Sequence, residues 1–318
     1  MIFIFVFSQY SADATGAEYL KIGAGVRPVA LGEAFTAIAD DAYAPFYNPA
    51  GISKIKFFHI SAMTMNLYWF GSYNVITTVF PISKKTGLGL SFSYIDIEDK
   101  VRDEKGEEGG KFSNYIALPM VSISQDFTKN LSLGTNIRYT ATKFYIYREN
   151  SFTIDVGYML KVKKYIYLAS TIQFIGSPII YRRLWEDPPL LIRNGFSVNI
   201  PFYDNHALFD MDFILPRNGI PYMGIGGEIQ LNLPQEAVEK LNTDWAVIKL
   251  YAGYRSNLSF VEWNGLSFGA SYEYRYAENF YISFDVLSIP YGPFGTEERI
   301  SVSLRYYPLS PLKKKKVH

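Results

Sequence analysis

The residue types that most often carry enzymatic chemistry occur here without the surroundings that such chemistry needs. Residues 265–269 read Gly-Leu-Ser-Phe-Gly, the spacing of a nucleophilic serine on a sharp strand-to-helix turn. However, apolar and polar residues alternate without a break on both sides of Ser267, which predicts the middle of a strand. His59 and His206 are the only internal histidines, and no acidic partner stands at a spacing that would make either a catalytic base. We therefore predict no catalytic site.

Acidic residues form a second group of candidates. Asp210 and Asp212 lie two residues apart, so they would share one face of a strand as polar lining rather than as a metal site. Residues 96–111 hold seven acidic and four basic residues. A solvated loop explains this segment as well as a divalent cation or a basic partner does. We predict no metal and no cofactor.

The composition limits which elements can hold these residues. The 318-residue chain is 17% aromatic and 19% charged, contains no cysteine and has a net charge of +1. So many aromatic residues fit the girdles of a membrane β-barrel, and the low net charge argues against nucleic acid as a partner. No run of 18 apolar residues occurs, which excludes a membrane-spanning helix and leaves a closed barrel as the way to span a membrane.

Alternation with period two is the main signal of this sequence. It runs through residues 131–142, 266–275, 280–286 and 299–306. One face of each segment carries large apolar residues, and the other carries small, polar or charged ones, as expected for a lipid-facing exterior and a wet lumen. Charged residues that this pattern places on the lumen side are Arg138, Lys249, Arg255, Glu273, Arg275, Asp285, Arg299 and Arg305. Such charges must pair or be hydrated, so they would form either a salt-bridged lumen or a docking surface for the acids Glu33, Asp40 and Asp41.

The connections between these segments indicate an all-β, antiparallel transmembrane barrel of about 14 strands, beginning near Ile55. Short connections at 81–87, 126–130, 161–164, 201–205 and 277–279 alternate with longer ones at 96–111, 176–189, 256–264 and 288–298. Barrels of the outer membrane show this asymmetry of short periplasmic turns and long outer loops. Two outer connections, near 70–71 and 148–150, are predicted to be short. Residues 233–244 are predicted to be helical at their centre, although they lie on the short-turn side.

Residues 23–51 read as neither signal nor strand, so we expect the strands to enclose them. From Pro28, apolar residues recur at helical spacing up to Ala42, which predicts a helix. Asp40 and Asp41 at its end would need a backbone amide or a basic residue as partner. Asn48, Pro49, Ala50 and Gly51 have the composition of a turn.

The two ends of the chain are predicted to lie outside the barrel. An apolar run at 2–7, followed by Ala12-Asp13-Ala14, is typical of a secretory signal peptide cleaved after residue 14. This gives a signal peptide at 1–14, a plug at 15–53, a barrel at 54–308 and a basic tail at 309–318. The lysines at 313–316 could contact anionic headgroups or a periplasmic partner, or form a solvated terminus.

Four short motifs within the plug segment carry a family resemblance. They are Gly-Ala-Gly-Val-Arg at 23–27, Leu-Gly-Glu-Ala-Phe at 31–35, Ala-Asp-Asp-Ala at 39–42 and Tyr-Asn-Pro-Ala-Gly at 47–51. In this order and spacing they resemble the N-terminus of PorV/PorQ-type proteins, a branch of the FadL-like outer-membrane barrels. The resemblance implies a fourteen-stranded barrel with an N-terminal plug in the lumen. The plug or gating residues would be Arg27, Glu33, Phe35, Asp40, Asp41, Tyr47, Asn48, Pro49, Ala50 and Gly51.

The resemblance leaves two functional hypotheses. The first is a non-enzymatic barrel for type IX secretion, which binds the signal domains of exported proteins or other secretion components. The second is a FadL-like passive transporter, in which a hydrophobic small molecule binds between plug and wall and leaves sideways through a gap in the barrel. Both place the protein in the outer membrane of a diderm bacterium, in contact with lipid. A mainly apolar pocket would favour transport, whereas an open mouth wide enough for a peptide would favour secretion.

Overall fold

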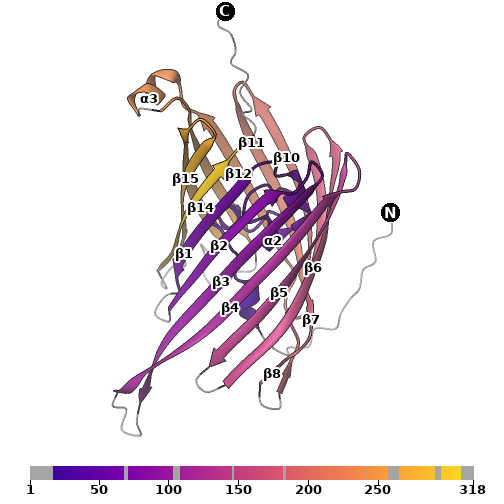
Figure 1. The fold of residues 1–318 in the computed structure, drawn as a ribbon, viewed down its shortest axis with the longest axis vertical. Coiled ribbons are helices and arrows are strands. Elements are labelled where there is room, and N and C mark those ends of the chain that lie inside the picture. The colour runs from indigo at the N-terminus through magenta and orange to yellow at the C-terminus, as the bar shows by residue number, and fades with distance from the viewer. Residues whose placement is uncertain are drawn as a thin grey trace, which may run out of the picture.

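The strands close into a single antiparallel barrel around the N-terminal segment (Figure 1). The structure, a computed structural model, describes residues 17–67, 71–102, 108–144, 147–181, 184–241, 243–256, 265–290 and 295–308. Fourteen strands form the barrel, which closes because β1 pairs with both β2 and β16. The predicted fold class and strand number are confirmed. The barrel strands are β1 (Phe58–Asn66), β2 (Gly71–Pro81), β3 (Thr86–Arg102), β4 (Glu108–Asp126), β5 (Leu131–Phe144), β6 (Tyr147–Lys163), β7 (Ile166–Gly176), β10 (Leu191–Phe202), β11 (Asn205–Pro216), β12 (Tyr222–Asn232), β13 (Ala246–Arg255), β14 (Leu266–Ala277), β15 (Phe280–Pro290) and β16 (Thr296–Tyr306).

The apolar face of each alternating segment points away from the barrel axis. In β5, Leu133 and Ile137 are 40% and 55% exposed, whereas Asn136 and Arg138 are 0% and 4% exposed. This is the arrangement of a barrel whose exterior meets lipid tails and whose interior is polar. As for helices, none within the described residues is both long and apolar enough to cross a membrane.

The two ends of the barrel differ in their connections. At one end, which we call the short-turn end, two to four residues join β2 to β3, β4 to β5, β6 to β7, β10 to β11 and β14 to β15. The connection from β12 to β13 at this end contains α3 (Gln235–Lys240), so the predicted helical centre is confirmed. At the opposite end, the long-connection end, a small hairpin of β8 (Ile179–Tyr181) and β9 (Leu184–Glu186) lies between β7 and β10.

The positions of two predicted connections at the long-connection end were wrong. Residues 96–111 are mostly strand, because β3 continues to Arg102 and β4 starts at Glu108, and their ladder extends to the Arg102–Glu108 pair. This hairpin projects beyond the barrel (Figure 1). A paired ribbon satisfies its own backbone hydrogen bonds, so charged residues did not end the strands here. The other connection is misplaced by a few residues, because β5 ends at Phe144 and β6 begins at Tyr147, so residues 148–150 lie inside β6. The suggested cation or partner site at 96–111 falls mainly on side chains outside the described set.

The segment inside the barrel, which we call the plug (residues 17–57), is irregular rather than one helix. Its elements are η1 (Glu18–Lys21), α1 (Val26–Ala30), α2 (Ala44–Tyr47) and η2 (Pro49–Lys54). The helix predicted from Pro28 to Ala42 was wrong, because Gly32 and Glu33 adopt left-handed conformations with φ of 66° and 62°. Strands surround this segment, so apolar residues are buried on all of its sides and their spacing does not report a helix. The predicted signal peptide (1–14) and basic tail (309–318) lie outside the described residues.

Candidate functional site

Glycines on the inner wall let the plug backbone approach the strands directly. A Cβ added at Gly134 of β5 would lie 2.4 Å from the Ala50 nitrogen, and one at Gly253 of β13 would lie 2.1 Å from the Gly32 nitrogen. A Cβ at Gly195 of β10 would similarly lie 2.8 Å from the Ala37 nitrogen. Such distances exclude any side chain at these wall positions unless the backbone shifts. The plug is therefore fitted against the wall on several sides.

Asn48 connects the turn at 48–51 to the rest of the plug and to the wall. Its Oδ1 accepts from the Ala50 N–H at 3.0 Å, which caps η2. Its Nδ2 donates to the Thr36 carbonyl at 2.9 Å and to the Tyr158 carbonyl of β6 at 3.1 Å. Pro49, Ala50 and Gly51 are buried beside it, so this turn fills the lumen as the resemblance implied.

Glu33 carries the principal ion pairs between plug and wall. Its Oε1 lies 2.5 Å from Arg255 Nη1 of β13, and its Oε2 lies 3.3 Å from Arg193 Nη2 of β10. Burial alone would raise the pKa of Glu33, but Arg255, Arg193 and Arg299 together hold it below its usual 4.5. The carboxylate is therefore ionised at neutral pH. Arg299 also donates to the Gly23 carbonyl and pairs with Glu297 at 2.6 Å.

Arg27 is the partner of the two consecutive acids. Its Nη1 contacts Asp40 and lies 3.3 Å from Asp41 Oδ2, while its Nε donates to Glu228 Oε2 of β12 at 2.6 Å. Asp41 Oδ1 also accepts from the Tyr43 N–H at 2.8 Å. Burial raises the pKa of Asp41 to about 6, against the opposing effect of Arg27 and together with that of Asp40. The basic partner of Asp40 and Asp41 thus comes from the plug itself, not from a wall arginine.

Aromatic residues of the plug pack within the lumen rather than line an opening. Phe35 is fully buried and meets Tyr47 edge to face, with ring centroids 5.4 Å apart. The Tyr47 hydroxyl donates to the Ala24 carbonyl at 3.0 Å. Arg27 lies over the Phe35 ring, 5.3 Å from its centroid. These contacts hold the first and second halves of the plug together.

The remaining predicted lumen charges fall into separate groups. Arg138 pairs with Asp155 of β6 at 3.2 Å and lies over the Phe174 ring. Glu273 contacts both Lys249, at 3.1 Å, and Arg305. Two further residues complete the set: Asp285 accepts from the Ser301 hydroxyl, and Arg275 pairs at the short-turn rim with Asp244, away from the plug.

Several residues of the plug–wall contact were not found from the sequence. Arg193, Glu228 and Asp155 are buried partners of Glu33, Arg27 and Arg138. Each stands at the polar position of an alternating segment, and this is the signal that could have found them. Alternation assigns a face but not a partner: Arg193 and Glu228 meet residues of the plug that are 160 and 201 positions away, whereas Asp155 meets Arg138 of the neighbouring strand.

Three of the candidate catalytic and metal residues, Ser267, His59 and Asp212, hold the plug instead. Ser267 Oγ donates to the Ala30 carbonyl at 2.9 Å, and His59 Nδ1 accepts from the Ala42 N–H at 3.1 Å. Asp212 Oδ2 accepts from the N–H groups of Phe35 and Thr36, at 3.3 and 3.1 Å. Ser267 lies within β14 and not on a strand-to-helix turn. Among the described residues no cluster of three or more His, Asp or Glu could hold a metal ion.

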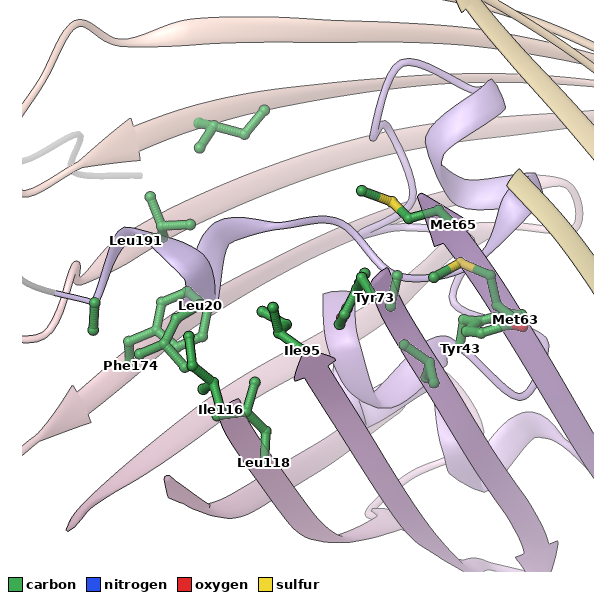
Figure 2. Close-up of a cluster of buried hydrophobic side chains, with 14 of the residues drawn as sticks. Leu20, Tyr43, Met63, Met65, Tyr73, Ile95, Ile116, Leu118, Phe174 and Leu191 are labelled. Carbon is green, nitrogen blue, oxygen red and sulfur yellow. The ribbon is translucent and has the colours of Figure 1, made fainter. Parts of the chain in front are cut away.

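The lumen differs on the two sides of this central contact. At the long-connection end, buried apolar side chains of the plug, including Leu20, pack against those of the wall, and we call this packed region the apolar chamber (Figure 2). At the short-turn end lies a polar cavity of about 300 Å³. The residues that build the chamber are Ala17, Leu20, Ala24, Tyr43, Met63, Met65, Tyr73, Val75, Ile95, Ile116, Leu118, Phe174, Leu191, Ile214 and Tyr222.

The wall beside the apolar chamber has an interruption in its ladder. Pairing of β4 with β5 is recorded from Tyr115 to Ala117 and from Met120 onward, but not at Leu118 and Pro119. Proline has no N–H to donate, and Pro119 faces outward while Leu118 faces the chamber. The seam between β4 and β5 is therefore weakest where it borders the apolar chamber.

Several solved structures have a similar architecture. The toluene transporter TbuX of Ralstonia pickettii is 11% identical with a TM-score of 0.56, and the match covers 89% of this chain and 97% of that one. TodX, a toluene transporter of P. putida, is 9% identical with a TM-score of 0.58, covering 89% and 98%. A Pseudomonas aeruginosa FadL homologue is 11% identical with a TM-score of 0.53, covering 89% and 99%. No protein-family model and no curated protein matches the sequence.

The protein is thus a closed fourteen-stranded β-barrel with a lumen filled by its own N-terminal segment. Within that class its fold is FadL-like, because the three structural matches each cover 89% of this chain. Their sequence identities of 9% to 11% establish the fold alone.

Proposed function

We propose that this chain is a non-enzymatic outer-membrane channel that passes hydrophobic small molecules without an energy source. The observation that carries the proposal is the packed apolar chamber at the long-connection end, built from aliphatic, aromatic and methionine side chains. An apolar ligand that displaces Leu20 of the plug would meet surroundings of the kind that suit it, and methionine adapts to ligands of varied shape. The named function of the similar TbuX and TodX barrels, toluene transport, supports the same class of cargo.

The seam at Pro119 supplies the sideways exit that this function needs. The opposite route through the short-turn end leads past Arg27, Glu228 and the polar cavity, where an apolar molecule gains nothing from its surroundings. A molecule in the chamber instead contacts Leu118, one residue from the interrupted ladder. We infer that the cargo leaves between β4 and β5 into the bilayer.

Uptake of radiolabelled toluene by a heterologous diderm host tests the transport function. Cells that make the protein should accumulate toluene several-fold faster than cells that do not. Ile95→Asn, which places an amide in the chamber, should remove most of this increase. Val79→Asn changes an equally buried residue on the neighbouring strand β2, outside the chamber, and should keep it. Equal uptake by the Ile95→Asn and wild-type proteins, with both migrating as heat-modifiable barrels, would refute a route through the chamber.

A PorV/PorQ-type role in type IX secretion rests on the sequence resemblance, which is carried mainly by the motifs of residues 23–51. A secretion partner would require a mouth wide enough for a peptide, whereas the plug fills the described lumen between the chamber and the polar cavity. This filling favours the small-molecule function. A pull-down from outer-membrane extract tests the alternative, since stoichiometric recovery of an exported signal domain would favour secretion.

A further inference from the structure

The polar cavity at the short-turn end has the size and lining of a ligand site. Its volume of about 300 Å³ falls at the lower end of the range for small-molecule sites. The plug forms one side through Arg27, Asp40 and Asp41, and strands β1 and β11 to β16 form the other. Tyr43 of the plug belongs to both the cavity lining and the apolar chamber, but none of the wall residues does. The cavity therefore has a wall of its own, distinct from that of the proposed transport route.

The part of the cavity around Arg27, where the plug meets Glu228 of β12, has an excess of negative charge. Asp40, Asp41 and Glu228 share the single guanidinium of Arg27. Three carboxylates around one cation leave a net charge of about −2 once Asp41 is ionised, above the pKa of about 6 to which burial raises it. The Asp40 side chain remains 51% exposed, so its carboxylate is accessible from the cavity. An ammonium group is the natural complement.

The wall side offers hydrogen-bond donors instead. His59 Nδ1 accepts from the Ala42 N–H, so a neutral His59 carries its proton on Nε2. This Nε2 is buried and has no hydrogen-bond partner among the described residues, in a side chain that lines the cavity and is 4% exposed. Lys249 and Arg305 both contact the carboxylate of Glu273, and Asp285, which also lines the cavity, lies close enough to interact with both cations. The buried Nε2 donor of His59 beside these two cations calls for an oxygen acceptor.

We propose that this cavity binds a small zwitterion of the amino-acid type. Its ammonium group would lie against Asp40 and Glu228, and its carboxylate would accept from His59 Nε2 and Lys249. Hydroxyl groups of Ser271, Ser283 and Ser301 line the space between the two sides. Because Asp40 belongs to the plug and His59 and Lys249 to the wall, the ligand joins the two and holds the plug in place.

Calorimetric titration of the purified full-length protein in detergent tests this site with three probes. L-Glutamine carries both charged groups, putrescine only ammonium groups and glutarate only carboxylates. At pH 7.5 glutamine should bind at least tenfold more tightly than either of the other two. Asp40→Asn and Lys249→Met should each weaken glutamine binding at least tenfold. Glu278→Gln, which removes an exposed carboxylate in the turn after β14, should leave it unchanged.

Three results would overturn the proposal. Absence of glutamine binding would make the cavity a hydrated vestibule only. Putrescine binding as tight as glutamine would make it a cation site. Wild-type affinity in both the Asp40→Asn and Lys249→Met proteins would place the ligand elsewhere. Heat-modifiable migration of every variant checks the barrel, and none of these readouts depends on toluene transport.

Discussion

At the scale of single residues, Glu33 is the contact on which the seating of the plug depends most. It is 3% exposed and contacts guanidinium groups from β10 and β13. Glu33→Gln leaves the buried Arg193 and the half-buried Arg255 with only part of their charge compensated, and removing one partner of a buried pair costs about 3 kcal/mol or more. We expect a corresponding fall in the free energy of unfolding, measured by urea titration in detergent at pH 7. Glu278→Gln at the exposed turn is the control.

The same residue predicts how the wild-type protein responds to acid. Because the arginines lower the pKa of Glu33 below 4.5 in the folded state, its contribution to stability is complete above pH 4.5. This contribution is lost as the pH falls through the folded-state pKa. Wild-type stability should therefore fall below about pH 4.5, and the fall should be smaller in Glu33→Gln. Parallel curves for the two proteins would contradict this assignment.

Asp41 has the opposite dependence on pH. Its folded-state pKa of about 6 lies above its ordinary 3.8, so the folded protein binds the proton more tightly and loses stability as pH rises from about 4 to 6. The shift of about two units corresponds to at most about 3 kcal/mol. Asp41→Asn should remove this slope in urea titrations between pH 4.5 and 7.5. An unchanged slope would mean that another group is responsible.

Some of these residues could be predicted from the sequence, but their partners could not. Alternation placed Arg255 and Arg299 on the lumen side, where lumen charges were expected either to pair with one another or to meet the plug acids. The structure shows such a contact between Arg255 and Glu33. For Asp40 and Asp41 the wall-docking suggestion was wrong, because Arg27 of the plug meets both. Arg27 and Asp40 are thirteen positions apart in the sequence. The chain reverses through the left-handed residues Gly32 and Glu33, and this brings the two side chains together. Helical periodicity could not predict that reversal.

At the scale of elements, the inward glycines determine how closely plug and strands approach. Gly134→Ala would place a methyl group 2.4 Å from the backbone of Pro49 and Ala50, and overpacking of this kind costs about 1–3 kcal/mol. We expect a loosened turn at 48–51 and faster cleavage of the plug by added protease. Gly227→Ala is the matched control, because its Cβ would meet nothing closer than the Leu208 carbonyl at 3.9 Å. Equal cleavage rates would exclude this role for Gly134.

The seam between β4 and β5 offers a second test of an element. Pro119→Val restores an N–H at the interrupted position and a residue that favours strands. If the cargo leaves through this seam, toluene uptake should fall at least threefold while the affinity for toluene stays the same. Uptake equal to that of the wild-type protein would place the exit elsewhere.

The strands themselves could be predicted better than the plug, for a physical reason. A barrel strand has lipid on one side and a polar lumen on the other, so apolar and polar residues alternate along it. In β5, for example, Leu133 and Ile137 are exposed on the outside and Asn136 is buried inside. The plug has wall on all sides, so its apolar residues carry no period. The hairpin of β3 and β4 was missed because its outer part, up to Arg102 and Glu108, leaves the barrel and is no longer constrained by the lipid–lumen contrast.

At the scale of the whole molecule, the barrel and its plug are separable in principle. The ladder runs around the wall and closes between β1 and β16, so the barrel does not need the plug to satisfy its strand edges. The lumen charges do need it, because Arg193, Arg255 and Arg299 each contact plug atoms. Without the plug these groups would be hydrated, as in an open barrel with a polar interior.

Deletion of residues 23–51 should therefore leave a barrel that is open to water. We expect the deleted protein to keep its heat-modifiable migration, and its proteoliposomes to swell in small sugars several-fold faster than those of the wild-type protein. Glu33→Gln should lie between the two, because it weakens the seating of the plug without removing it. Swelling of the deleted protein at the wild-type rate, with the barrel shown to be intact, would mean that the plug does not seal the lumen.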